Sequence, residues 1–511
     1  MTASPSSQTP PSLHRRGRPP LRQLWPDLVL GAVGALGLAP FGIWAATPIA
    51  FAILIWRLAR LRPAAVFWHA LVAGFGWFAV ALFWIVEPFL VEPETYGWMA
   101  PFALVLMALG GALFWAIPGW LAAIWARNWR MQAVGIAVAL ALSDWLRGWL
   151  FTGFPWALIG HAWIDTPVAQ LAAWGGPLGL STFTLALGTL PALLWRPSLP
   201  RATACLIPAF AAIVALGGAW AFGLARLAAP SPAETGKIIR IVQPNATQHL
   251  KWDPEWSQVF FDRLLDLSSE PGPHDLVIWP ETAVNFLLED ANPILPAMSQ
   301  AANAPLVMGI QRRDGSRYYN SLAVVEPGGE LTQTYDKFHL VPFGEYVPWG
   351  DTLAKIGIGA FAAQQGNGYS SGTGPQVIQT GDIPPFQPLI CYEAIFPQHL
   401  RNLTTRPAWI LQATNDAWFG NISGPYQHLA QARLRAIESG LPVARAANTG
   451  VSAMIDAKGR IRDSLDMQQT GKMDVALPSA LPATFWIRTG NAPLLVLLSL
   501  LMLATLRLKR R

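Results

Sequence analysis

The most regular feature of the chain is a series of long apolar segments separated by short polar loops. Each segment is close to the ~20 residues that an α-helix needs to cross the hydrocarbon core of a bilayer. The segments lie at about 24–40, 44–60, 66–88, 98–125, 131–149, 167–195, 203–225 and 491–507. The pattern predicts a polytopic α-helical membrane domain of eight spans, with seven spans before a polar region and one after it.

Charged residues in the loops predict the orientation of these segments. The chain begins with an arginine-rich tail and ends in Arg507-Leu-Lys-Arg-Arg511, and every second loop between spans is basic. The loop at 86–97 instead carries three glutamates and no basic residue. Because basic loops stay in the cytoplasm, we expect both termini there and residues 230–485 on the outer side of the membrane. The basic loops contain Arg57, Arg60 and Arg62, then Arg127 and Arg130, then Arg196 and Arg201.

The polar region between the seventh and eighth spans has a different pattern. Short β-rich segments alternate there with helical patterns at 254–267 and 425–438, which predicts an α/β layered domain. The β-rich segments lie at 237–243, 276–280, 306–311, 321–325, 388–391, 409–412 and 451–456. The Gly- and Ala-rich segment 356–374 is expected to form a flexible lid.

We therefore divide the chain into four parts. These are a disordered basic tail (1–22), a seven-span membrane domain (23–228), an α/β domain (229–485), and the eighth span with a basic tail (486–511).

The composition agrees with a membrane protein. Of the 511 residues, 52% are hydrophobic, only 13% are charged and 25 are tryptophan, too few charges to cover a soluble protein of this size. The net charge of +6 reflects arginines beside apolar segments, so we do not expect nucleic-acid binding. No His or Cys residues have metal-ligand spacing, and we expect a monomer without metal or diffusible cofactor.

Three reactive side chains follow apolar or β-rich segments of the polar region. Glu281 follows Val277-Ile-Trp-Pro, Lys337 follows Thr334-Tyr-Asp, and Cys391, one of two cysteines, follows Gln387-Pro-Leu-Ile. A carboxylate, an amine and a thiol are the groups that acyl transfer through a thioester requires. Glu281 can act as general base toward the thiol. Lys337 and the backbone N–H of Tyr392 can stabilise an oxyanion.

These motifs together resemble a known family. Trp-Pro-Glu281, Tyr-Asp-Lys337-Phe-His-Leu-Val-Pro-Phe-Gly-Glu345 and Cys391-Tyr-Glu393 are similar to the Glu–Lys–Cys signatures of the nitrilase (carbon–nitrogen hydrolase) superfamily, whose domain is an α-β-β-α sandwich. Such a domain between a seventh and an eighth span resembles the bacterial apolipoprotein N-acyltransferases. Lys251-Trp-Asp253 and Thr414-Asn-Asp-Ala-Trp-Phe-Gly420 agree with that resemblance.

The resemblance implies roles for eight residues. Glu281 is the base, Lys337 stabilises the oxyanion, and Cys391 is the nucleophile. Glu345, Tyr392 and Glu393 match further functional positions of the family, and Trp252 and Trp418 match aromatic positions near the entrance for the acyl chain.

The resemblance also implies a ping-pong reaction at the bacterial inner membrane, with the α/β domain facing the periplasm. A phospholipid acylates Cys391. The α-amine of the S-diacylglyceryl cysteine of an apolipoprotein then takes the acyl group, which is the last step of lipoprotein maturation.

Two other functions fit parts of the pattern. A membrane-tethered nitrilase-like amidase would share the three reactive residues but would use water as acceptor and a soluble substrate. A transporter with an outer binding domain would use the spans, although these lack the broken helices and midplane charges typical of carriers.

Overall fold

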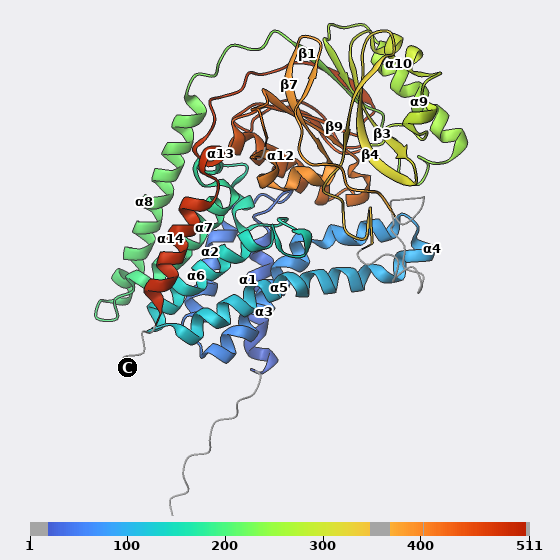
Figure 1. The fold of residues 1–511 in the computed structure, drawn as a ribbon. Coiled ribbons are helices and arrows are strands. Elements are labelled where there is room, and N and C mark those ends of the chain that lie inside the picture. The colour runs from blue at the N-terminus through green and yellow to red at the C-terminus, as the bar shows by residue number, and fades with distance from the viewer. Residues whose placement is uncertain (1–18, 348–367, 402, 507–511) are drawn as a thin grey trace, which may run out of the picture.

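A computed structural model describes residues 19–347, 368–401 and 403–506. It has a helical region formed by the N-terminal half and the C-terminal helix, with an α/β domain above it (Figure 1). Most of the predicted lid, residues 356–367, lies outside the described residues, as do residues 1–18 of the predicted tail.

Each of the eight predicted apolar segments overlaps a helix. The long elements are α1 (Leu21–Ala35), α2 (Ala46–Leu58), α3 (Pro63–Ala81), α5 (Ala100–Trp125), α6 (Trp129–Leu146), α7 (Ala172–Leu194), α8 (Arg201–Ala228) and α14 (Ala492–Thr505). Short elements between them are η1 (Phe83–Leu90), α4 (Pro93–Tyr96), η2 (Gly97–Met99), η3 (Leu150–Thr152), η4 (Ile159–Trp163) and η5 (Pro167–Leu171).

Four stretches of the described chain are long and apolar enough to cross a membrane. They are Pro63–Ala81, Pro93–Trp125, Pro167–Leu194 and Arg201–Ala228, while α2 and α14 are apolar but shorter. The start of α1 and the end of α14 both lie at the end of the helical region that is away from the α/β domain (Figure 1).

Glycines allow α1 and α3 to pack closely. A side chain at Gly31 of α1 would collide with the Ala73 carbonyl of α3, and one at Gly76 of α3 would collide with the Leu28 carbonyl of α1. Small residues at such crossings let helix backbones approach where lipid offers no hydrophobic driving force.

The α/β domain contains two six-stranded sheets. The first has the order β12-β1-β2-β3-β4-β5 and the second the order β11-β10-β9-β8-β7-β6. The first sheet is formed by β1 (Ile238–Gln243), β2 (Leu276–Ile278), β3 (Leu306–Asp314), β4 (Arg317–Val325), β5 (Leu331–Asp336) and β12 (Gly471–Ala476). The second is formed by β6 (Ile378–Thr380), β7 (Ile383–Ile390), β8 (Trp409–Thr414), β9 (Val443–Ala447), β10 (Ser452–Ile455) and β11 (Ile461–Leu465).

The two sheets pack face to face, and helices cover their outer faces. One buried core joins Ile241 of β1 and Ile278 of β2 to Ile390 of β7 and Leu411 of β8. A second core joins the first sheet to α9 (Pro254–Ser269) and α10 (Leu295–Ala302), and a third joins the second sheet to α12 (Gly424–Ser439). The layer order is therefore α-β-β-α. The remaining elements are η6 (Leu288–Asp290), η8 (Cys391–Ile395), η9 (Pro397–Leu400), η10 (Asp416–Phe419) and α13 (Phe485–Thr489).

The loop between α6 and η4, residues 147–158, joins the helical region to the α/β domain. Tyr392 donates a hydrogen bond to the Gly153 carbonyl (3.0 Å), and the Trp156 indole donates to Gln427 of α12 (2.6 Å). These buried bonds fix the loop beneath the α/β domain.

Candidate active site

Sheet topology explains why reactive residues far apart in sequence meet. β2 and β5 run in the same direction in the first sheet, because β1, β2 and β3 are parallel and two antiparallel steps separate β3 from β5. Glu281 and Lys337 follow the carboxyl ends of these two strands, and Cys391 directly follows β7 of the second sheet. Ligand sites in α/β folds typically lie beyond the carboxyl ends of strands.

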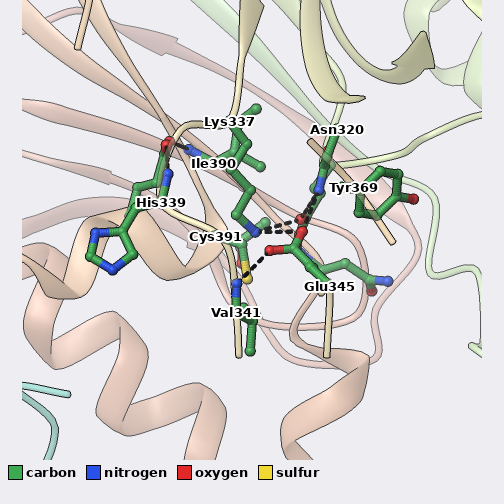
Figure 2. Close-up of polar contacts among 12 residues, drawn as sticks. Asn320, Lys337, His339, Val341, Glu345, Tyr369, Ile390 and Cys391 are labelled. Atoms are coloured by element: carbon green, nitrogen blue, oxygen red, sulfur yellow. Dashed lines mark hydrogen bonds and ion pairs between the residues drawn. The ribbon is translucent and has the colours of Figure 1, made fainter. Parts of the chain in front are cut away.

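A buried ammonium lies between two buried carboxylates. Lys337 Nζ donates to Glu345 Oε1 at 2.9 Å and to Glu281 Oε1 at 3.4 Å. The Asn320 amide donates to the same two oxygens, at 3.0 Å and 2.7 Å. Figure 2 shows Asn320, Lys337 and Glu345 converging beside Cys391. The group therefore forms one connected polar network around the thiol.

Backbone hydrogen bonds fix the orientation of both carboxylates. The N–H of Asn415 donates to Glu281 Oε2 at 2.8 Å, and the N–H of Val341 donates to Glu345 Oε2 at 2.8 Å. Neither carboxylate can rotate without losing a buried hydrogen bond. Glu281 is thus held in one orientation, as a general base requires.

Lys337 is suited to electrostatic stabilisation rather than to proton exchange. Burial alone would lower the pKa of its ammonium, but the charges of Glu345 and Glu281 outweigh burial and hold the pKa above its ordinary value. Lys337 therefore remains a cation at neutral pH and can stabilise a developing negative charge.

Cys391 is held at a sharp turn from β7 into η8. Its φ of 48° lies in the left-handed region, which is uncommon for a residue with a side chain and is often found at functional sites. Burial raises the pKa of the thiol well above its usual range, Glu281 raises it further, and Lys337 opposes the shift. The resting sulfur is therefore a thiol, and it requires a base to become a nucleophile.

A buried charged cluster holds the backbone carbonyl of Cys391 in place. His428 of α12 hydrogen-bonds to the Cys391 carbonyl through Nε2 (3.1 Å) and to Asp416 through Nδ1 (2.9 Å). Arg445 of β9 donates to the other oxygen of Asp416. Burial would raise the pKa of Asp416, but Arg445 and His428 lower it to about 2, so the cluster keeps its carboxylate.

Glu393 joins the segment that carries Lys337 to the strand that precedes Cys391. One carboxylate oxygen accepts from the N–H of Phe338 (2.8 Å), and the other accepts from the N–H of Ile390 (2.8 Å). Because its side chain is bonded to both segments, Glu393 limits their movement relative to one another.

The thiol opens into one cavity of about 530 Å³. Glu281, Lys337 and Cys391 line its polar end, and most of the remaining lining is aromatic or aliphatic. The helical region contributes Phe78, Leu82, Trp84, Ile85, Met107, Phe114, Phe154 and Trp156. A cavity of this composition suits an apolar chain with one polar reacting group.

The structure brings seven of the eight predicted site residues to this cavity. The seven are Trp252, Glu281, Lys337, Glu345, Cys391, Tyr392 and Trp418. Glu393 is not part of the lining.

Asn320, Asn415 and His428 also contribute to the site, although the sequence predicted no role for them. Asn320 directly precedes the predicted β-rich segment at 321–325, and its polar side chain there is the one signal in the sequence for any of the three.

Comparison with known proteins identifies the family. Residues 239–481 match the carbon-nitrogen hydrolase family, and residues 30–190 match the apolipoprotein N-acyltransferase N-terminal domain. An apolipoprotein N-acyltransferase from Rhodopseudomonas palustris is 38% identical over 515 aligned positions, which cover 94% of each chain. The chain belongs to the apolipoprotein N-acyltransferase family. A second member of this family, from Brucella suis, is 36% identical and covers 92% of this chain and 93% of its own.

The solved structures that resemble this chain each cover about half of its length. A CN-hydrolase superfamily protein from Xanthomonas campestris covers 52% of this chain and 96% of its own, with 21% identity and a TM-score of 0.36. An amidase from Nesterenkonia sp. covers 52% and 97%, with 18% identity and a TM-score of 0.38. Membership in the apolipoprotein N-acyltransferase family follows from the sequence relatives alone.

Proposed function

We propose that the protein transfers an acyl group from a phospholipid to the N-terminal amine of an S-diacylglyceryl apolipoprotein, through a thioester on Cys391. The observation that carries the proposal is the single cavity in which Glu281, Lys337 and Cys391 meet aromatic side chains of the helical region. A soluble substrate does not need such a lining, so both the cavity and the family favour the transferase over a membrane-tethered amidase.

In the first half-reaction, Glu281 takes the proton of the Cys391 thiol as sulfur attacks the ester carbonyl of the phospholipid. The ammonium of Lys337 and the N–H of Tyr392 stabilise the oxyanion of the tetrahedral intermediate. The intermediate collapses to the thioester, and Glu281 returns its proton to the leaving alkoxide, which departs as a lysophospholipid.

In the second half-reaction, the neutral α-amine of the acceptor attacks the thioester carbonyl. Glu281 takes a proton from the attacking nitrogen, and the same two donors stabilise the second oxyanion. Collapse forms the amide, and the leaving sulfur recovers a proton from Glu281. The enzyme returns to its starting state without any cofactor.

The product of the second half-reaction distinguishes an acyltransferase from an amidase. When the acylated protein is mixed with a diacylglyceryl lipopeptide, we expect the acyl group to appear as an amide on the peptide α-amine rather than as free fatty acid. Product analysis by mass spectrometry measures the ratio. Predominant release of fatty acid in the presence of the lipopeptide would favour the amidase.

We further propose eight spans in the bacterial inner membrane, with the α/β domain in the periplasm. The alternating basic loops support this orientation. The start of α1 and the end of α14 lie at the same end of the helical region, away from the α/β domain (Figure 1). A chain that starts and ends on the same side crosses the membrane an even number of times, which supports the proposal.

A reporter enzyme that is active only in the periplasm tests the orientation. Fused after Thr235, between α8 and β1, it is expected to be active. The matched fusion after Arg127, in a basic loop, is expected to be inactive because that loop remains in the cytoplasm. The opposite pair of activities would contradict the orientation.

A further inference from the structure

A second hollow lies beside the cavity of Cys391 and differs from it in chemistry. This cleft has a volume of about 600 Å³ and is lined mainly by amide, hydroxyl and other polar side chains. They come from the loop between β1 and α9, the turn after η10, and the loops that follow β9 and β11. The polar lining consists of Asn245, Thr247, Gln248, His249, Asn421, Thr449, Gln468 and, from η1 of the helical region, Glu87.

The same segments form one wall of the cleft and one wall of the cavity. In η1, Ile85 and Pro88 face the cavity, whereas Glu87 faces the cleft. In and after η10, Phe419 faces the cavity and Gly420 faces the cleft. A side chain at Gly420 would collide with the Glu87 carboxylate, so the two segments meet closely. The cavity side of this partition is aromatic and aliphatic, whereas its cleft side combines the polar Glu87 and Asn421 with Leu90, Val91 and Ala417.

Gln248 is the residue that lines both spaces. Its amide oxygen accepts from the side chain of Asn415 (2.8 Å), and the N–H of Asn415 donates to Glu281 (2.8 Å). Two hydrogen bonds thus connect the cleft to the carboxylate that would deprotonate an attacking amine.

The cleft also holds two features that indicate a binding surface. Asn245 and Gln468 both have left-handed backbones (φ 51° and 64°), and such conformations cluster at functional sites. The side-chain amide of Asn245 donates to the Gln468 carbonyl (2.7 Å), which holds these two segments together at the cleft.

We propose that this cleft binds the polypeptide that follows the modified cysteine of the acceptor. The inference rests on the proposed function, which requires an acceptor with a lipid part and a peptide part. The lipid part fits the apolar cavity, but a peptide backbone buried there would leave its N–H and C=O groups unpaired. The polar cleft can pair them, and Gln248 marks the junction at which the α-amine reaches Glu281.

Separation of the two half-reactions tests the proposal. Thr247→Trp and Asn421→Trp fill the cleft from two exposed positions, and Thr332→Trp on the exposed face of β5 is the matched control. Each full-length variant is first acylated with a diacyl phospholipid. It is then mixed with either S-diacylglyceryl cysteine amide, which has no peptide, or a lipopeptide in which a polypeptide follows the same group.

We expect both cleft variants to form the acyl-enzyme at the rate of the unmodified protein, which also shows that they are folded. Their kcat/KM for the lipopeptide should fall at least about tenfold, as expected for losing one or two hydrogen bonds, while kcat/KM for the cysteine amide and all rates of the control stay unchanged.

Other outcomes would overturn the inference. Equal losses with both acceptors, or no loss with either, would show that the peptide does not lie in the cleft. Slower acyl-enzyme formation would assign the cleft to the donor head group. Absence of acyl-enzyme in the unmodified protein would instead contradict the proposed function.

Discussion

Glu281→Gln is expected to slow acylation of Cys391 by about 10²–10⁴-fold, the usual contribution of a positioned general base. The thiol is buried and protonated at rest, so acylation depends on a group that removes its proton. An amide cannot accept that proton. Both oxygens of Glu281 accept hydrogen bonds, one from the Asn320 amide and the other from the Asn415 N–H. The NH₂ group of a glutamine at this position would therefore meet one of these two donors and lose a hydrogen bond.

The measurement is the rate of acyl-enzyme formation from labelled phospholipid at fixed pH. Glu330→Gln, at an exposed position after β4, is the matched control and should leave the rate unchanged. Acylation of Glu281→Gln within about threefold of the control would assign the proton transfer to another group.

Lys337→Met is expected to impair both stability and activity. Methionine keeps the length of the side chain but leaves Glu281 and Glu345 as two buried carboxylates without their shared cation. Removing one partner from a buried ion pair typically costs about 3–5 kcal/mol. Without the ammonium, acyl-enzyme formation should also fall by about 10²–10³-fold, as for loss of one oxyanion donor.

A double variant separates the two effects of Lys337. Lys337→Met with Glu345→Gln removes one of the two carboxylates, so part of the lost free energy of unfolding should return while acylation stays slow. Thermal and denaturant unfolding measure the first quantity. Lys237→Met, which removes a half-buried lysine from a pair with the exposed Asp382, is the control. Restored activity in the double variant would show that Lys337 acts only by offsetting Glu345.

Regular apolar patterns predicted much of the fold. Each of the eight apolar segments overlaps a helix, and every predicted β-rich segment overlaps a strand. Five strands of the described chain lie outside the predicted segments: β5, β6, β9, β11 and β12. For example, β5 reads Leu-Thr-Gln-Thr-Tyr-Asp and is buried at one position, and β9 reads Val-Ala-Arg-Ala-Ala. β9 is buried between β8 and β10, and its Arg445 is paired with the buried carboxylate of Asp416, a contact that sequence periodicity cannot indicate.

The sequence predicted the reactive residues of the site because each of them follows a strand. Glu281, Lys337 and Cys391 each come at or soon after the end of a strand, and the resemblance to a family supplied Glu345. The supporting contacts were not predictable, because they join distant segments. Asn320 links Glu281 to Glu345 from the middle of β4, and Asn415 contributes its backbone N–H rather than its side chain.

Acylation of Cys391 by a phospholipid is the central claim, and the intact mass of the protein tests it most directly. After incubation with a diacyl phospholipid, the protein should gain the mass of one acyl group in place of one hydrogen. Peptide mapping should place the group on Cys391, and a diacylglyceryl lipopeptide should remove it. No adduct, an adduct at another residue, or an unchanged mass shift in Cys391→Ala would contradict the account.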